Sequence, residues 1–203
     1  MAIRTPAAER ICSAAVIHFA QRGYDGSSLT EIAEAVGIRK ASLYAHFASK
    51  DALFLQAYGD ALQGELAFVQ ACFNAEVARA LPGSHYCGGL ASRYSESPHL
   101  RFLLRTSYVP PQSLEKEIEQ GFLSYLASLS ELFGVRLEAW PETANRLSCA
   151  DIKLYVEAYR SIVDCLHVKL VYTSGKNISE RLKIMQRLLH ESLRVAVIKG
   201  EQE

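Results

Sequence analysis

Hydrophobic positions recur every three or four residues along nearly the whole chain, which is the spacing of one face of an α-helix. Thr5-Pro6 opens the first helix and Gly23 closes it, and the apolar stripe between them is Ile11, Ala14, Ala15, Phe19 and Ala20. No segment shows the convincing apolar-polar alternation of a half-buried strand. The pattern therefore predicts an all-α protein.

The same periodicity divides the rest of the chain into helices. Ser49 caps a long helix over about residues 50–77, and a short helical piece lies between Gly88-Gly89 and Ser97-Pro98. Residues 99–107 form another short piece, and residues 113–133 form a longer amphipathic helix. A loop is expected over 134–146, before two long helices over 150–173 and 178–199.

The segment from residue 27 to residue 51 has the pattern of a helix, a tight turn and a second helix. Ser28-Leu29-Thr30-Glu31 is a capping-box sequence, and Gly37 supplies the turn. Leu43 and Phe47 are expected to dock the second helix onto the preceding ones. Two short helices joined in this way are typical of a helix-turn-helix DNA-binding element.

Polar and cationic side chains occupy the positions that this element would leave open. Arg39 and Lys40 lie where side chains reach base edges, and either can donate to guanine. Tyr44, His46 and Lys50 suit phosphate oxygens, and Ser42 suits either bases or phosphate. Free backbone N–H groups beside Ser28 and Thr30 favour phosphate as well. The predicted DNA-binding residues are Ser28, Thr30, Arg39, Lys40, Ser42, Tyr44, His46 and Lys50.

The net charge of the chain limits how much general electrostatic attraction can contribute to DNA binding. The 203 residues contain 22 Lys and Arg against 22 Asp and Glu, so the formal net charge is zero. Residues 1–50 hold six basic side chains against four acidic ones. This excess is too small for binding by bulk electrostatics, so the positions of individual side chains have to matter.

Residues 7–56 resemble the N-terminal domain of the TetR family of bacterial transcriptional repressors. The resemblance is carried by the run FAQRGYDGSSLTEIAEAVGIRKASLYAHFASKDALF, with Gly23-Tyr24, Ile32-Ala33, Val36-Gly37, Leu43-Tyr44 and Phe47-x-x-Lys50. It implies a three-helix helix-turn-helix domain over 1–50 and a larger helical ligand-binding and dimerisation domain over 51–203. The family's phosphate contacts fall on Tyr44, His46 and Lys50. Arg39 departs from the capping serine common in relatives, so this helix is expected to lack a side-chain cap.

The resemblance also implies a cytoplasmic homodimer that binds a double-stranded DNA operator and responds to a small-molecule effector. The last two helices carry enough apolar positions to cover both their own core and a partner. Within them the predicted dimerisation residues are Ile162, Leu166, Leu182, Met185, Leu189 and Leu193. A mostly apolar cavity with a few polar groups would hold the effector. Its predicted lining is Tyr94, Phe102, Arg105, Phe122, Tyr125, Tyr155 and Tyr159, although core packing is the simpler role for each aromatic residue.

Other functions receive less support from the sequence. Five dispersed cysteines without a CxxC pair favour reduced thiols, but Cys72, Cys87, Cys149 or Cys165 leaves a redox-responsive regulator as an alternative. Neither a metal site nor a cofactor is expected, because the His and Cys spacing fits no ligand set. The absence of a nucleophile elbow or a phosphate loop argues against an enzyme. No membrane span is expected, since no run of 18 apolar residues occurs.

Overall fold

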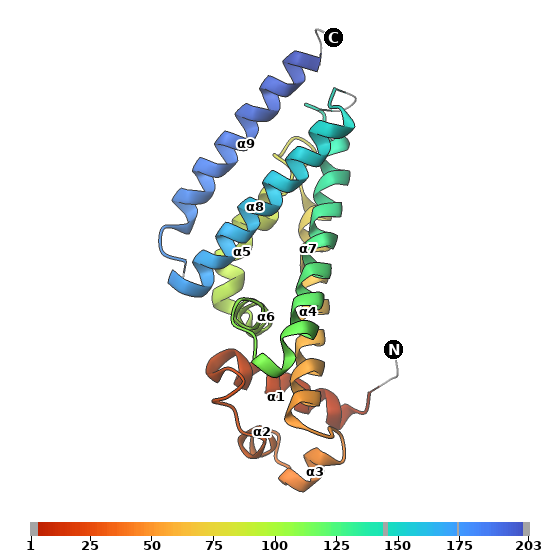
Figure 1. The fold of residues 1–203 in the computed structure, drawn as a ribbon, viewed down its shortest axis with the longest axis vertical. Coiled ribbons are helices and arrows are strands. Elements are labelled where there is room, and N and C mark those ends of the chain that lie inside the picture. The colour runs from red at the N-terminus through yellow and green to blue at the C-terminus, as the bar shows by residue number, and fades with distance from the viewer. Residues whose placement is uncertain (1–3, 144–145, 174, 201–203) are drawn as a thin grey trace. The chain divides into compact units, whose positions relative to one another are not determined.

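The computed structural model describes residues 4–143, 146–173 and 175–200, and this part of the chain is all-helical, as predicted. Figure 1 shows the helices, whose bounds are α1 Pro6–Arg22, α2 Leu29–Ala35, α3 Lys40–Tyr44, α4 Lys50–Ala75, α5 Ser84–Glu96, α6 Pro98–Tyr108, the 3-10 helix η1 Gln112–Leu114, α7 Glu115–Glu138, α8 Cys149–Thr173 and α9 Ile178–Gly200. None of these helices is both long and apolar enough to cross a lipid bilayer.

Contacts group the chain into two compact units. The first unit contains Met1–Glu65 and Ser95–Leu123, and the second contains Leu66–Tyr94 and Ser124–Glu203. Helix α6 therefore packs with the N-terminal helices rather than with the rest of the C-terminal region, so this grouping differs from a division at residue 50. Helices α4 and α7 run from one unit into the other.

Side-chain caps explain where several helices begin. The Thr5 hydroxyl accepts a hydrogen bond from the Ala8 amide, with Pro6 in the first helical position. The Ser28, Ser49 and Ser97 hydroxyls cap α2, α4 and α6 in the same way. Each cap satisfies an amide that has no partner within its own helix, which contributes about 1 kcal/mol.

An aromatic cluster forms the core of the first unit. Phe19 of α1 stacks on Phe102 of α6 at 5.7 Å between ring centroids, and Phe54 of α4 meets both rings edge-on. Tyr58 extends the cluster, and its hydroxyl donates to the Ile118 carbonyl at 3.2 Å. Because the rings come from α1, α4 and α6, this cluster fixes the helix that precedes the helix-turn-helix element.

The core of the second unit is also aromatic but carries more polar atoms. Tyr159 of α8 stacks flat on Phe133 of α7, with centroids 4.0 Å apart, and its hydroxyl donates to the Gly83 carbonyl. Glu76, whose side chain is 1% exposed, accepts hydrogen bonds from the Gly83 and His85 amides and pairs with Arg136. This carboxylate holds the first turn of α5 onto the end of α4.

Two sequence predictions about helix ends were wrong. Helix α7 continues through Gly134 to Glu138, because Leu137 extends the apolar stripe one turn beyond Phe133 and both side chains are 0% exposed. Burial of this stripe outweighs the roughly 1 kcal/mol that a glycine costs inside a helix. Likewise, Gly88 and Gly89 lie within α5 instead of bounding it.

Helices α8 and α9 lie side by side in the second unit (Figure 1). The inner face of α9 is formed by Ile178, Leu189, Leu193 and Val197, all of which are buried in the single chain. A second apolar set on α9 is exposed, namely Ile184, Leu188, Val195 and Ile198. The helix thus has one apolar face that is covered by its own chain and another that is open.

Candidate nucleic-acid interface

A small set of buried apolar side chains packs the two helices of the helix-turn-helix element together. Leu29, Ile32 and Ala33 of α2 and Leu43 of α3 are at most 8% exposed. The turn between them places Gly37 at φ 74°, a left-handed conformation that a side chain would strain. The Ile38 amide returns to the Ala33 carbonyl at 3.0 Å. The helix-turn-helix geometry that the sequence predicted is therefore present.

Helix α3 is shorter than the sequence suggested. It has five residues, Lys40–Tyr44, and Arg39 is its N-cap residue without a side-chain capping bond, as expected from the missing serine. His46 lies beyond the helix, in a turn where its amide bonds to the Leu43 carbonyl at 2.9 Å. His46 is thus not part of the helix face, although it remains exposed beside it.

The residues predicted to contact bases and phosphates are nearly all open to solvent. Arg39, Lys40, Ser42 and His46 are exposed, and Tyr44 is 48% exposed although it is aromatic. Ser28 and Thr30 are exposed at the start of α2. An exposed tyrosine beside two basic residues on a short helix is a surface that suits a nucleic acid better than a protein core.

Helix α2 is also tied to the end of α1. Arg22, the last residue of α1, donates to the Glu31 carboxylate at 2.6 Å, and this bond holds the pKa of that carboxyl below its usual range. The Ser27 hydroxyl donates to the Gly23 carbonyl at 2.8 Å. These two contacts connect the end of α1 to the start of α2, close in sequence to the predicted phosphate contacts at Ser28 and Thr30.

Lys50 is less exposed than the other residues that are predicted to contact DNA. It is the first residue of α4 and is half-buried, with its ammonium 4.3 Å from the centroid of the Tyr24 ring. The Tyr24 hydroxyl donates to the carboxylate of the next residue, Asp51. Tyr24 belongs to the pattern that resembles the TetR family, but the sequence alone indicates no role for it.

The residues predicted to line an effector cavity fall into both units. Phe102 belongs to the aromatic core beside Phe19, and Phe122 packs on Tyr108, 5.5 Å between centroids, in the first unit. Arg105 is exposed and donates to the Ala20 carbonyl at 2.8 Å, near the end of α1. It therefore satisfies a carbonyl in the last turn of α1, where carbonyls lack partners within the helix, and its place in the lining of an effector cavity stays a prediction.

Tyr94, Tyr125, Tyr155 and Tyr159 belong to the second unit. There the Tyr86 hydroxyl lies 2.8 Å from the Tyr125 hydroxyl and 3.1 Å from Nε2 of His167. Burial lowers the pKa of His167 to about 3, so the imidazole is neutral. Tyr86 and His167 were not among the predicted ligand residues, because their partners are 39 and 81 residues away in sequence.

A groove runs between α8 and α9. It has a volume of about 460 Å³ and is lined mainly by apolar side chains, among them Leu154, Ile162, Met185 and Leu188. Of the predicted dimerisation residues, Ile162, Leu182 and Met185 are half-buried and remain available. Leu166, Leu189 and Leu193 are at most 6% exposed and form the core of the single chain. Leu189 also lines the groove, so the predicted dimerisation residues lie partly along the groove and partly in the core of the chain itself, and their role in a dimer stays a prediction.

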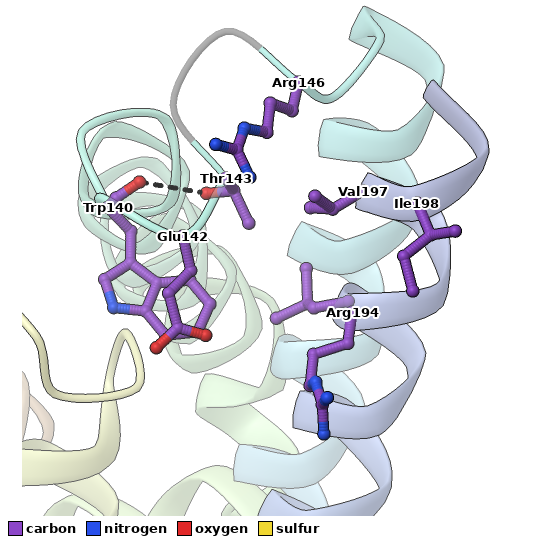
Figure 2. Close-up of a pocket in the computed structure, with 8 residues that line it drawn as sticks. Trp140, Glu142, Thr143, Arg146, Arg194, Val197 and Ile198 are labelled. Carbon is purple, nitrogen blue, oxygen red and sulfur yellow. Dashed lines mark hydrogen bonds between the residues drawn. The ribbon is translucent and has the colours of Figure 1, made fainter. Parts of the chain in front are cut away.

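Figure 2 shows a smaller pocket of about 270 Å³, lined by Trp140, Glu142, Thr143, Arg146, Leu193, Arg194, Val197 and Ile198. Arg146 points back toward Thr143, whereas the guanidinium of Arg194 points away from it (Figure 2). The two cations do not converge, so the pocket lacks the geometry of an anion site. Among the described residues, no group of three His, Cys, Asp or Glu could hold a metal ion.

Comparison with known proteins agrees with this geometry. Residues 11–57 match the family of bacterial regulatory proteins, tetR family. The biofilm operon icaADBC HTH-type negative transcriptional regulator IcaR of Staphylococcus aureus (strain Newman) is 46% identical over 48 residues, which are 24% of this chain and 26% of IcaR. The chain thus spans about a quarter of the length of this curated relative.

Solved structures extend the likeness of the fold to most of the chain. The fatty acid degradation regulator FadR from Bacillus halodurans has a TM-score of 0.66 and 16% identity, with coverage of 92% of this chain and 96% of FadR. FadR from Bacillus subtilis in complex with stearoyl-CoA has a TM-score of 0.63 and 16% identity, with coverage of 89% and 96%. The sequence match to the tetR family covers residues 11–57, and the structural likeness at 16% identity shows that the rest of the chain shares the fold of these regulators.

Proposed function

We propose that the protein is a homodimeric transcriptional repressor that binds a palindromic operator through α2 and α3. The observation that carries the proposal is the exposed row of Arg39, Lys40, Ser42 and Tyr44 directly after the Gly37 turn. Such side chains at the start of a recognition helix reach base edges and phosphates in the major groove. The negative regulator IcaR, whose similarity covers this element, supports repression as the outcome.

Electrophoretic mobility shift with promoter fragments from the source genome tests this proposal. A discrete complex that weakens steeply with salt is expected, because phosphate contacts release counterions. A folded dimer that shifts none of these fragments would refute sequence-specific binding.

Replacing Arg39 by alanine is expected to change sequence preference more than overall affinity. A bidentate contact from arginine to guanine contributes about 1–3 kcal/mol of discrimination, and Arg39 is exposed and outside the helix ladder, so the fold should not change. Competition between the operator and single-base variants measures the effect. Tyr44→Phe is the matched control, since loss of its phosphate contact should weaken binding to all variants alike.

The groove between α8 and α9 supports dimerisation through these helices. An open apolar face on paired helices is stabilised when a second copy covers it. A twofold partner also places two recognition helices about 34 Å apart, the distance of one DNA turn. The residues proposed for this interface are Leu154, Ile162, Leu182, Ile184, Met185 and Leu188.

A small molecule bound in the second unit is the proposed signal for release from DNA. The buried hydroxyls of Tyr86 and Tyr125 and the neutral His167 are hydrogen-bonding groups in the largely aromatic core of the second unit. Such a core suits a ligand with a mostly apolar body and few polar groups. The stearoyl-CoA complex of a protein with this fold, FadR from Bacillus subtilis, supports effector binding as a property of the fold.

A thiol-based signal is the alternative, and burial argues against it for most of the cysteines. Cys12, Cys72 and Cys87 are buried, and burial raises the pKa of Cys12 to about 11 and that of Cys87 to about 12. Both thiols are therefore protonated and unreactive near neutral pH. Cys149 is exposed and Cys165 is half-buried beside Arg181, so a redox response would have to use these two.

Alkylation with iodoacetamide at pH 8, followed by mass spectrometry, is expected to modify Cys149 first and to leave Cys12 and Cys87 unmodified in the folded protein. Cys149 is exposed, whereas burial limits access to Cys12 and Cys87 and raises the pKa of both thiols. The denatured protein, in which all five cysteines should react, is the control. Rapid labelling of Cys87 in the native state would show that the core opens far more often than this structure implies.

A further inference from the structure

Tyr24 contacts two neighbouring charged residues at the start of α4. Its ring face lies 4.3 Å from the Lys50 ammonium, and its hydroxyl donates to the Asp51 carboxylate. The edge of the same ring packs against Phe54 with centroids 5.1 Å apart, which fixes the ring within the first unit. The arrangement links the turn after α1 to the residue that the family pattern assigns to DNA phosphate.

A lysine side chain that is free in solution loses rotamer freedom when it binds, and this loss weakens the contact. A cation held over an aromatic ring has already lost part of that freedom. The ammonium still has three N–H donors, and a ring face satisfies none of them as a hydrogen-bond acceptor would. Lys50 can therefore be ordered by Tyr24 and still donate to a phosphate oxygen.

The hydrogen bond from Tyr24 to Asp51 also affects the contact between Lys50 and a DNA phosphate. An unshielded carboxylate next to Lys50 would repel an approaching phosphate. The hydrogen bond from the Tyr24 hydroxyl to the Asp51 carboxylate lowers this repulsion. Burial and the Asp51 bond raise the pKa of Tyr24 to about 12, so the hydroxyl remains protonated and able to donate near neutral pH.

We propose that Tyr24 is a positioning residue for DNA binding: it holds the Lys50 ammonium in place for a backbone phosphate and shields the Asp51 carboxylate. This inference rests on the proposed function. The opposite role would be sequestration, in which the ring withholds Lys50 from DNA. The two roles predict opposite changes in affinity when the ring is removed.

A double-mutant cycle on the full-length protein separates these roles. Binding of wild type, Tyr24→Leu, Lys50→Met and the double variant to a short duplex of arbitrary sequence is measured by fluorescence anisotropy at several salt concentrations. Tyr24→Leu is expected to weaken binding about three- to tenfold, and to have a clearly smaller effect in the Lys50→Met background, where only the shielding of Asp51 is lost. Both single changes should reduce the salt dependence, with a slope change of about 1 per chain for Lys50→Met.

Three controls isolate the ring. Tyr24→Phe keeps the ring but loses the bond to Asp51, so it should weaken binding less than Tyr24→Leu does, and its difference from wild type measures the shielding of Asp51. Tyr172→Leu in α8 and Lys116→Met in α7 alter exposed residues and should change binding little. Ring-current shifts of the Lys50 side-chain protons in NMR of the wild-type protein test the contact directly, even if Tyr24→Leu fails to fold, and they should persist when duplex is added.

The outcomes are distinct. If Tyr24→Leu reduced DNA affinity equally in the wild-type and Lys50→Met backgrounds, Tyr24 would affect binding only by stabilising the fold. If Tyr24→Leu bound DNA more tightly than wild type, the ring would sequester Lys50. Either result overturns the positioning role but leaves the proposed function standing. A folded wild-type protein that binds neither this duplex nor any promoter fragment from the source genome would overturn the proposed function itself.

Discussion

Leu188→Asp is expected to convert the protein from a dimer to a folded monomer and to weaken operator binding by about 100-fold or more. Leu188 is 67% exposed in the single chain and lines the groove between α8 and α9. In a twofold interface the change occurs twice, and each copy replaces about 1.5–3 kcal/mol of apolar burial with a buried unpaired carboxylate. A monomer then loses the gain of binding two half-sites together.

Sedimentation velocity measures the oligomeric state, and anisotropy on an operator fragment measures affinity. Leu123→Asp is the matched control, because Leu123 of α7 is 56% exposed but lies in the first unit. It should leave both quantities unchanged. If Leu188→Asp remained a dimer with wild-type affinity, the α8–α9 face would not be the interface.

Glu76→Ala is expected to lower the free energy of unfolding by about 3–5 kcal/mol. The carboxylate is 1% exposed, and its removal leaves Arg136, which is 15% exposed, without its ion-pair partner. The Gly83 and His85 amides at the start of α5 lose their acceptor at the same time. Because Gly83 also receives the Tyr159 hydroxyl bond, the loss should extend into the core of the second unit.

Urea denaturation followed by circular dichroism measures this change. Glu157→Ala removes a carboxylate that pairs with Arg160 on the surface of α8, where both side chains are about half exposed. An exposed pair of this kind contributes less than about 1 kcal/mol, so the control should differ little from wild type. If both variants lowered the free energy of unfolding equally, the buried contacts of Glu76 would contribute no more to stability than an exposed ion pair.

Features set by local sequence were predictable. The caps at Thr5, Ser28 and Ser49 and the turn at Gly37 each depend on a few neighbouring residues, and the structure has all four. The all-helical class and the helix-turn-helix element follow from the same local signals. The extent of α7 was missed because Gly134 is a weak break, and the burial of Leu137 against distant parts of the chain overrides it.

Features set by contacts between distant residues were not predictable from one sequence. A spacing of three and four residues shows that α9 has an apolar face, but it does not say whether the same chain or a partner covers it. Leu189 and Leu188 are adjacent, and only the packing of α8 decides that the first is buried and the second exposed. For the same reason the contact of Lys50 with Tyr24, and that of Arg105 with Ala20, required the folded chain.

Selection from a library of random DNA duplexes tests the proposed function most directly. The full-length protein is incubated with the library, and bound duplexes are amplified and sequenced over several rounds. If α3 reads bases within a twofold dimer, the enriched sequences should share a palindromic motif with half-site centres about 10 base pairs apart. A folded protein that enriches no motif, or one motif without twofold symmetry, would contradict a dimeric repressor that recognises its operator through α2 and α3.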